Sequence, residues 1–170
     1  MDALSGIEDP IHYVFNDAIY KADRDPLWRE GISGSALLFD GYSTWMERPA
    51  GQFVQPVDQL TISAWVAPRS YEWGDLGQMS AIVNQHDKGQ GTGYILGMGR
   101  HGTWSFQAGV SGAWYEVWAV EEKPLRRDEW AYVVAMLDAQ HGTMALYLNG
   151  ERVGETAVPA GSRLATTTED

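Results

Sequence analysis

The sequence predicts an all-β fold in which two antiparallel sheets pack into a β-sandwich of the jelly-roll type. Three observations support this prediction. Short strand-like runs recur about every 10 to 15 residues from residue 36 onward, and none is longer than about eight residues. Several of these runs alternate apolar and polar residues. The 19 glycines and 7 prolines of the 170-residue chain supply turns between them, so we expect almost no helix.

The amino-terminal segment, residues 1–35, is predicted to be an irregular arm. Asp9-Pro10 and Asp25-Pro26 interrupt it, which leaves room for one short strand at residues 12–16. The chain shows no linker, so residues 1–170 are predicted to form one domain. The other predicted strands are residues 36–39, 60–66, 81–84, 94–98, 104–108, 115–120, 130–137, 144–148 and 152–157.

The alternation is clearest in two of these strands. In residues 60–66 the even-numbered residues are apolar and share one face, whereas Thr61, Ser63 and Trp65 share the other. Residues 144–148 alternate in the same way. They are followed by Asn149-Gly150, the dipeptide that a two-residue type I′ turn prefers because both central residues need a positive φ. The sequence therefore predicts a hairpin at this point.

Charge and composition exclude several functional classes. Twelve Lys and Arg against 23 Asp and Glu give a net charge of −11, which repels a nucleic-acid backbone. No apolar run approaches the roughly 20 residues of a membrane span. Cysteine is absent, so thiolate metal sites are excluded. The amino terminus lacks a signal-peptide pattern, so we expect a cytoplasmic chain as written, or an extracellular one if it is excised from a secreted bacterial enzyme.

Three stretches resemble the signature of laminin-G-like, concanavalin-A-like sandwich domains: residues 34–41 (GSALLFDG), 60–66 (LTISAWV), and 130–135 (WAYVVA) with 146–150 (LYLNG). The segments at 13–18, 26–29, 40–43 and 84–87 are similar to the accessory sandwich of bacterial family-32 glycoside hydrolases, which act on fructans. This resemblance implies a non-catalytic, carbohydrate-binding accessory module, with a polysaccharide or oligosaccharide as partner.

The family pattern usually finishes with two further strands that this sequence lacks. A missing pair of closing strands would leave a sheet edge open, which favours pairing with another chain. We therefore expect the isolated chain to be marginally stable, or to be completed by a partner such as a parent catalytic domain.

The sequence offers no convincing catalytic centre. The Glu-x-Asp-x-x-Glu strand of catalytic jelly rolls of the laminarinase type is absent, and so is the Gly-x-Ser-x-Gly elbow of serine hydrolases. The four histidines lie in separate segments without the spacing of a helical metal pair. The chain is therefore predicted not to be an enzyme.

Aromatic side chains provide the positive case for a function. Sugars need exposed rings for stacking and nearby polar groups for hydrogen bonds. Trp65, Trp104 and Trp130 are predicted to lie in the core, while Trp114 and Trp118 share a strand face with Glu116. An alternative is that the exposed aromatics form a structural interface with a parent enzyme. The predicted ligand-binding residues are Trp73, Asp75, His86, Asp87, Arg100, Trp114, Tyr115, Glu116 and Trp118.

One structural calcium ion is predicted as a cofactor, because the chain is acidic and sandwich domains of this class commonly hold one. Calcium requires six to eight oxygen ligands. The predicted ligands are Asp40, beside a glycine, with Asn16 or Asp17 of the arm.

Overall fold

The computed structural model describes residues 11–15, 18–21, 28–39, 44–46, 55–71 and 79–166. The chain divides into two compact units, Met1–Phe53 with Asp170 and Val54–Glu169. The boundary between the two units lies beyond residue 35, where the predicted arm ends.

The first unit holds two small antiparallel sheets. One has the order β2-β1-β5, formed by β1 (Ile11–Phe15), β2 (Ala18–Lys21) and β5 (Thr44–Met46). The other pairs β3 (Trp28–Glu30) with β4 (Ser35–Leu37). The sequence predicted β1 and β4 but missed the other three strands. Those three have only three or four residues each, too few to display an alternating pattern. β4 is equally short but overlaps the apolar run at residues 36–39.

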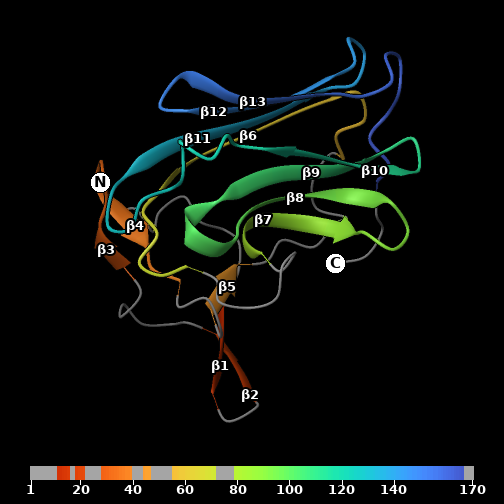
Figure 1. Cartoon of the computed structure of the whole chain (residues 1–170). Helices are drawn as coiled ribbons and strands as arrows, with labels where there is room; N and C mark the ends of the chain where they lie inside the picture. Colours follow the sequence, from red (N-terminus) through yellow and green to blue (C-terminus); the bar gives the residue numbers. More distant parts are fainter. Residues whose placement is uncertain are drawn as a thin grey trace. The chain divides into compact units, whose positions relative to one another are not determined.

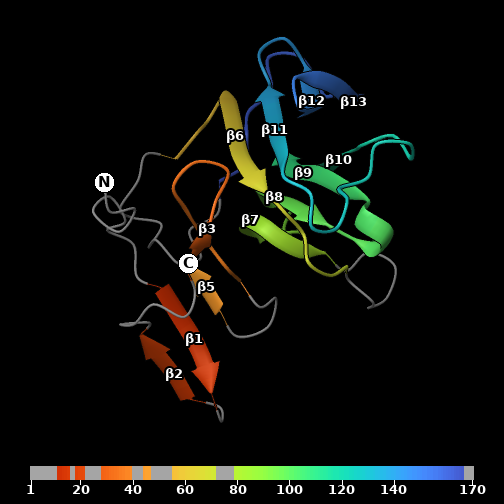
Figure 2. The same ribbon diagram turned by 90° about the vertical axis from the view of Figure 1, so that its left-hand side faces the viewer.

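The second unit consists of two four-stranded antiparallel sheets that lie one above the other (Figures 1 and 2). One sheet has the order β10-β9-β8-β7, formed by β7 (Ser80–Asp87), β8 (Thr92–Met98), β9 (Trp104–Val110) and β10 (Ala113–Trp118). The other has the order β13-β12-β11-β6, formed by β6 (Gln59–Val66), β11 (Ala131–Asp138), β12 (Thr143–Leu148) and β13 (Glu151–Ala157). The predicted antiparallel sandwich is confirmed.

Helical structure is confined to one short element in the described part of the chain, the 3₁₀ turn Arg100–Gly102 between β8 and β9. This agrees with the expectation that helix is almost absent. Within the same residues, no helix has the length and apolarity that crossing a membrane would require.

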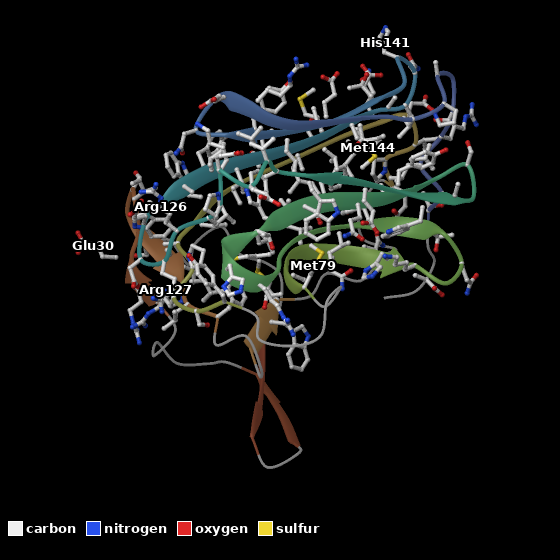
Figure 3. The ribbon with its side chains drawn as sticks, in the orientation of Figure 1. Glu30, Met79, Arg126, Arg127, His141 and Met144 are labelled. Carbon is white, nitrogen blue, oxygen red and sulfur yellow. The ribbon has the colours of Figure 1, made fainter. Side chains whose placement is uncertain are left out.

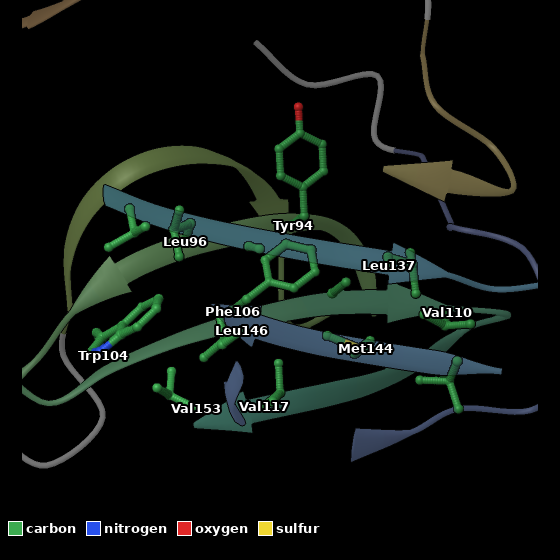
Figure 4. Packing of buried hydrophobic residues seen from close by; sticks show 14 of the residues in the cluster. Tyr94, Leu96, Trp104, Phe106, Val110, Val117, Leu137, Met144, Leu146 and Val153 are labelled. Carbon is green, nitrogen blue, oxygen red and sulfur yellow. The ribbon is translucent and has the colours of Figure 1, made fainter. Parts of the chain in front are cut away.

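The core lies between the two four-stranded sheets and is built from their inward-facing residues (Figure 4). Leu96, Trp104 and Phe106 from the first sheet are completely buried, as are Val133 and Leu146 from the second. The prediction that Trp104 lies in the core is confirmed. Its indole N–H also donates a hydrogen bond to the carbonyl of Lys123, at 3.1 Å, so the polar atom of this buried ring is satisfied.

The alternation in β6 is confirmed, but the predicted burial of Trp65 is wrong. Trp65 is 48% exposed, on the outward face with Thr61 and Ser63, and its ring lies 5.1 Å from that of its cross-strand partner Tyr132. A strand facing the core on one side must expose its other side, and the apolar residues 60, 62, 64 and 66 already occupy the inward side. The ring of Trp65 therefore packs on the sheet surface.

The hairpin between β12 and β13 has the predicted geometry. Leu148 pairs with Glu151, so Asn149 and Gly150 form a two-residue turn, and their φ angles are 51° and 87°. Both values lie in the left-handed region that a type I′ turn requires. Asn149 Oδ1 also accepts a hydrogen bond of 2.8 Å from the backbone N–H of Tyr132. The turn is thereby fastened to the start of β11.

Candidate functional site

The outer face of the β7–β10 sheet carries a row of aromatic and acidic side chains on β10. Val117 points into the core and is 1% exposed, so Trp114, Glu116 and Trp118 share the opposite face. Trp118 is 42% exposed. Four residues of extended strand place the Cα atoms of the two tryptophans about 13 Å apart. The predicted common face of these three residues is therefore confirmed.

Glu116 occupies the centre of this row and has both carboxylate oxygens engaged. Lys88 Nζ lies 2.8 Å from Oε1, and Trp118 Nε1 donates to Oε2 at 3.1 Å. Partial burial alone would raise the pKa of Glu116, but hydrogen bonds from Lys88, Trp118 and Trp114, together with the charge of Lys88, lower it overall. Glu116 is therefore an ionised and oriented acceptor at neutral pH.

Trp114 is held from two sides. Its Nε1 donates to Gln107 Oε1 at 3.0 Å, and its ring centroid lies 5.5 Å from the ring of His86 on β7. Lys88 Nζ lies 5.9 Å from the same indole centroid. Lys88, His86 and Trp114 therefore form one cluster at the end of the sheet that carries the β7–β8 turn.

His86 and Trp114 meet although β8 and β9 lie between their strands. Gly109 on β9 is the cross-strand neighbour of Trp114, and a Cβ at this position would collide with the carbonyl oxygen of Gly91. The backbone of the β7–β8 turn therefore comes directly against Gly109, which is possible only because Gly109 has no side chain. This approach brings Lys88 to Trp114 and Glu116.

His86 is oriented by Asn84, two residues earlier on the same strand. His86 Nδ1 and Asn84 Oδ1 form a hydrogen bond, and because an amide oxygen only accepts, this pairing assigns the proton to Nδ1. Nε2 of the neutral ring is then an acceptor. Burial lowers the pKa of His86; Asp87 opposes this effect, and Lys88 adds to it. The ring is therefore neutral at pH 7.

Buried polar residues on β9 hold Trp114 of the β10 row in place through hydrogen bonds. Ser105 and Gln107 are 0% and 5% exposed, and Gln107 Nε2 donates to Ser105 Oγ at 3.1 Å. Met79, labelled in Figure 3, places its sulfur 3.3 Å from Gln107 Nε2 and 3.4 Å from Ser105 Oγ. This network fixes the amide of Gln107, which in turn orients Trp114.

Sequence reasoning missed Lys88, Asn84, Gln107, Ser105 and Met79 as members of this cluster. A signal was available for two of them. Positions 105 and 107 alternate with buried apolar residues of β9 and therefore face outward beside 118 and 116. Lys88 gave no such signal, because its position depends on the path of a turn.

The other predicted ligand-binding residues lie elsewhere. Tyr115 is on the inward side of β10 and packs against the core. Asp87 Oδ1 accepts a hydrogen bond from the Gln90 N–H at 3.0 Å, so it shapes the β7–β8 turn. Arg100 belongs to the 3₁₀ turn that follows β8, at the opposite end of the strand from His86. Their binding roles stay predictions.

Five predicted residues fall outside the described residues: Trp73, Asp75, Asn16, Asp17 and Asp40. The last three are the predicted calcium ligands, so this site stays a prediction. In the parts of the chain that are described, no group of three or more His, Asp or Glu side chains is arranged to hold a metal ion.

Two antiparallel four-stranded sheets around one core, with aromatic and charged residues on one outer face, define a jelly-roll β-sandwich domain. A laminin G-type family model, described as the concanavalin A-like lectin/glucanases superfamily, matches residues 40–170, and the chain belongs to this family. Searches among curated proteins and among solved structures gave no significant match.

Proposed function

We propose that this domain is a non-catalytic carbohydrate-binding module and that the outward side of β10 is its binding surface. The observation that carries the proposal is the row of Trp114, Glu116 and Trp118 on one strand face, where Trp118 is exposed and the other two are partly exposed. Aromatic rings at both ends can stack on apolar sugar faces, and the central carboxylate can accept hydroxyl hydrogen bonds. Membership of a lectin and glucanase superfamily supports carbohydrate recognition.

The charges on this face favour a neutral glycan. Lys88 and Glu116 form an ion pair of 2.8 Å, so their charges cancel locally, and His86 is neutral. The protein as a whole carries −11, which disfavours a polyuronate or a sulfated chain. A face of a few stacking and hydrogen-bonding groups corresponds to dissociation constants between micromolar and millimolar, or about 4 to 8 kcal/mol.

The state of Glu116 supports a binding role rather than catalysis. A glycosidase needs a general acid whose pKa is raised, together with a second carboxylate across the scissile bond. The pKa of Glu116 is lowered, and its two oxygens are engaged by Lys88 and Trp118. This carboxylate is suited to accepting hydrogen bonds and unsuited to donating a proton.

Fructans are the proposed ligand class, and a larger glycoside hydrolase is the proposed parent protein. Both proposals rest on the sequence resemblance to accessory sandwiches of family-32 enzymes. The ligand can be tested on a glycan panel that contains levan, inulin and common plant polysaccharides. We expect binding of levan or inulin that Trp114→Ala and Trp118→Ala weaken. A folded protein that binds none of the glycans would refute the proposed function.

The alternative, an interaction domain that packs against a parent enzyme, is favoured by a different surface. Trp65, Tyr132 and Met136 lie on the outward face of the other sheet, and Trp65 and Met136 are 48% and 36% exposed. Apolar side chains gathered on one face are typical of interaction surfaces. Substituting Trp65 would then weaken association with the parent enzyme and leave glycan binding unchanged.

A further inference from the structure

A depression of about 270 Å³ lies at the end of the sandwich where β10 ends and β11 begins. Its apolar lining includes Trp130 and Leu148, and its charged lining comes from residues 122–129 of the β10–β11 loop. Arg126 and Arg127 mark this end in Figure 3, and His141 lies at the other end. We refer to this depression as the Trp130 cup. None of the face residues Trp114, Glu116 and Trp118 lines it.

Trp130 was predicted to lie in the core, but it is only partly buried and lines the cup. The indole immediately precedes β11, where the loop turns into the sheet. A partly exposed aromatic ring that lines a concave surface is suited to stacking against an apolar face of a ligand.

The loop that surrounds the cup is fixed in place by backbone hydrogen bonds. Leu125 is completely buried; its N–H donates to the Gly102 carbonyl at 2.9 Å, and its carbonyl accepts from Tyr71 OH at 3.0 Å. The Val120 N–H donates to the carbonyl of Val153 at 2.9 Å. Since the loop is already ordered, a ligand does not have to order it on binding.

Among the residues that the structure describes, three charged side chains at the cup are without partners. In the part of the chain that the structure describes, the side chains of Glu122, Arg126 and Glu129 have no hydrogen bond or ion pair. Lys123, by contrast, pairs with Glu151 at 2.7 Å. Arg127 lies outside the cup, with its guanidinium 5.7 Å from the ring centroid of Tyr71. Glu122, Arg126 and Glu129 are therefore available to a ligand in the cup.

These groups define the chemistry of a ligand. Two acids, Glu122 and Glu129, and two bases, Lys123 and Arg126, line the cup. Because Lys123 is already paired with Glu151, two carboxylates and one guanidinium remain for a ligand. A phosphate or an ammonium ion would meet like charge as well as opposite charge. A polyol hydroxyl both donates and accepts, and it can therefore bond to the carboxylates and to the guanidinium together.

We propose that the Trp130 cup is a second ligand site, which takes one ring of a neutral sugar. The volume supports a single ring, since about 270 Å³ is below the roughly 300 to 1,000 Å³ of pockets for drug-sized ligands. The cup therefore suits a free monosaccharide or the terminal residue of a chain, whereas the open β10 face suits the interior of a chain. The proposal does not depend on binding at that face.

The test follows the indole N–H resonance of Trp130 in the ¹⁵N-labelled full chain. Fructose, glucose, galactose and N-acetylglucosamine are titrated separately to about 50 mM, because single-ring ligands with few contacts bind at millimolar concentrations. We expect at least one sugar to give a saturable shift of the Trp130 resonance. If none of the four shifts it, the proposal is overturned.

Adjacent residues provide matched controls. Arg126→Ala and Glu122→Gln remove groups of the cup and should weaken the sugar response about tenfold each. Arg127→Ala and Glu121→Gln change neighbouring exposed residues outside the cup and should leave it unchanged. Trp114→Ala should also leave it unchanged while it weakens polysaccharide binding at the face. A response that is equal in all variants would show that the cup is not the site.

Discussion

The imidazole of His86 and the indole of Trp114 lie 5.5 Å apart between ring centroids, although they come from the two outer strands of a four-stranded sheet. The turn after His86 is packed against Gly109, which leaves room for Lys88 to approach both Trp114 and Glu116. The proposed binding face therefore depends on the close packing of the β7–β8 turn backbone against Gly109 as much as on its own side chains.

Substituting Gly109 should disturb this face without removing any of its groups. Gly109→Ala places a methyl group against the carbonyl of Gly91, and we expect a loss of about 1 to 3 kcal/mol in the free energy of unfolding. Glycan affinity should fall as well, because Lys88 is displaced. Gly89→Ala in the same turn is the milder comparison: its Cβ would lie 3.2 Å from Asp87 Oδ1, a side-chain atom that can shift, so we expect a loss below about 1 kcal/mol. Urea unfolding of the two variants measures the difference, and equal stability would contradict this packing.

Substitutions on the two aromatic faces should differ in their effect on glycan affinity. Trp118→Ala removes an exposed ring from the proposed binding face and should lower polysaccharide affinity by about tenfold, at a cost in stability below about 1 kcal/mol. Trp65→Ala removes a ring of comparable exposure from the other sheet and should leave glycan affinity unchanged. Calorimetric titration with the best ligand of the glycan panel provides the comparison. Equal losses in both variants would argue for a general effect on folding.

Acidification should destabilise the domain through His86. Its pKa in the folded protein is below the ordinary value of 6.5, mainly because the ring is partly buried. Between these two values the unfolded chain binds more protons than the folded one, so stability falls as the pH drops below about 6.5. Melting curves between pH 8 and pH 5 test this dependence.

His86→Gln should flatten that part of the pH profile. The lowered pKa of Glu116 acts at lower pH: its contribution is present above about 4.5 and is lost as the pH falls through its folded-state pKa. If the profile of His86→Gln matches that of the wild type between pH 6.5 and 5, the assigned role of His86 is incorrect.

Trp104 should be the most sensitive tryptophan for folding. It is completely buried between the sheets and bonds to Lys123, so Trp104→Ala should cost about 3 to 5 kcal/mol. Trp104→Phe keeps most of the volume and should lose less. Thermal unfolding followed by circular dichroism tests both variants. A loss below about 1 kcal/mol in Trp104→Ala would contradict the packing shown in Figure 4.

Several features could be predicted from local sequence because they depend on neighbouring residues alone. The alternation of residues 60–66 identified a strand and its inward face. Asn149-Gly150 identified the type I′ turn, since few other residues tolerate two consecutive positive φ angles. The spacing of Trp114, Glu116 and Trp118 correctly placed them on one side of a strand.

Other features required contacts between distant segments. Trp65 and Trp130 were expected in the core because large aromatic side chains are usually buried. Trp65 instead lies on the outward side of β6, and Trp130 at the rim, where the end of the sheet leaves it partly open. The presence of an aromatic residue indicates that its ring will pack against other side chains. It does not indicate which side of its strand faces the second sheet.

The sequence by itself determined the all-β sandwich, the strands of the second unit and the common face of the β10 row, because an extended chain alternates its side chains with a period of two. Tertiary structure decided which groups join that row. Lys88, His86 and Gln107 reach it from other strands and from a turn whose path depends on Gly109. It also decided that Glu122, Arg126 and Trp130 surround one cup, because the β10–β11 loop is folded and fastened only by contacts with distant residues.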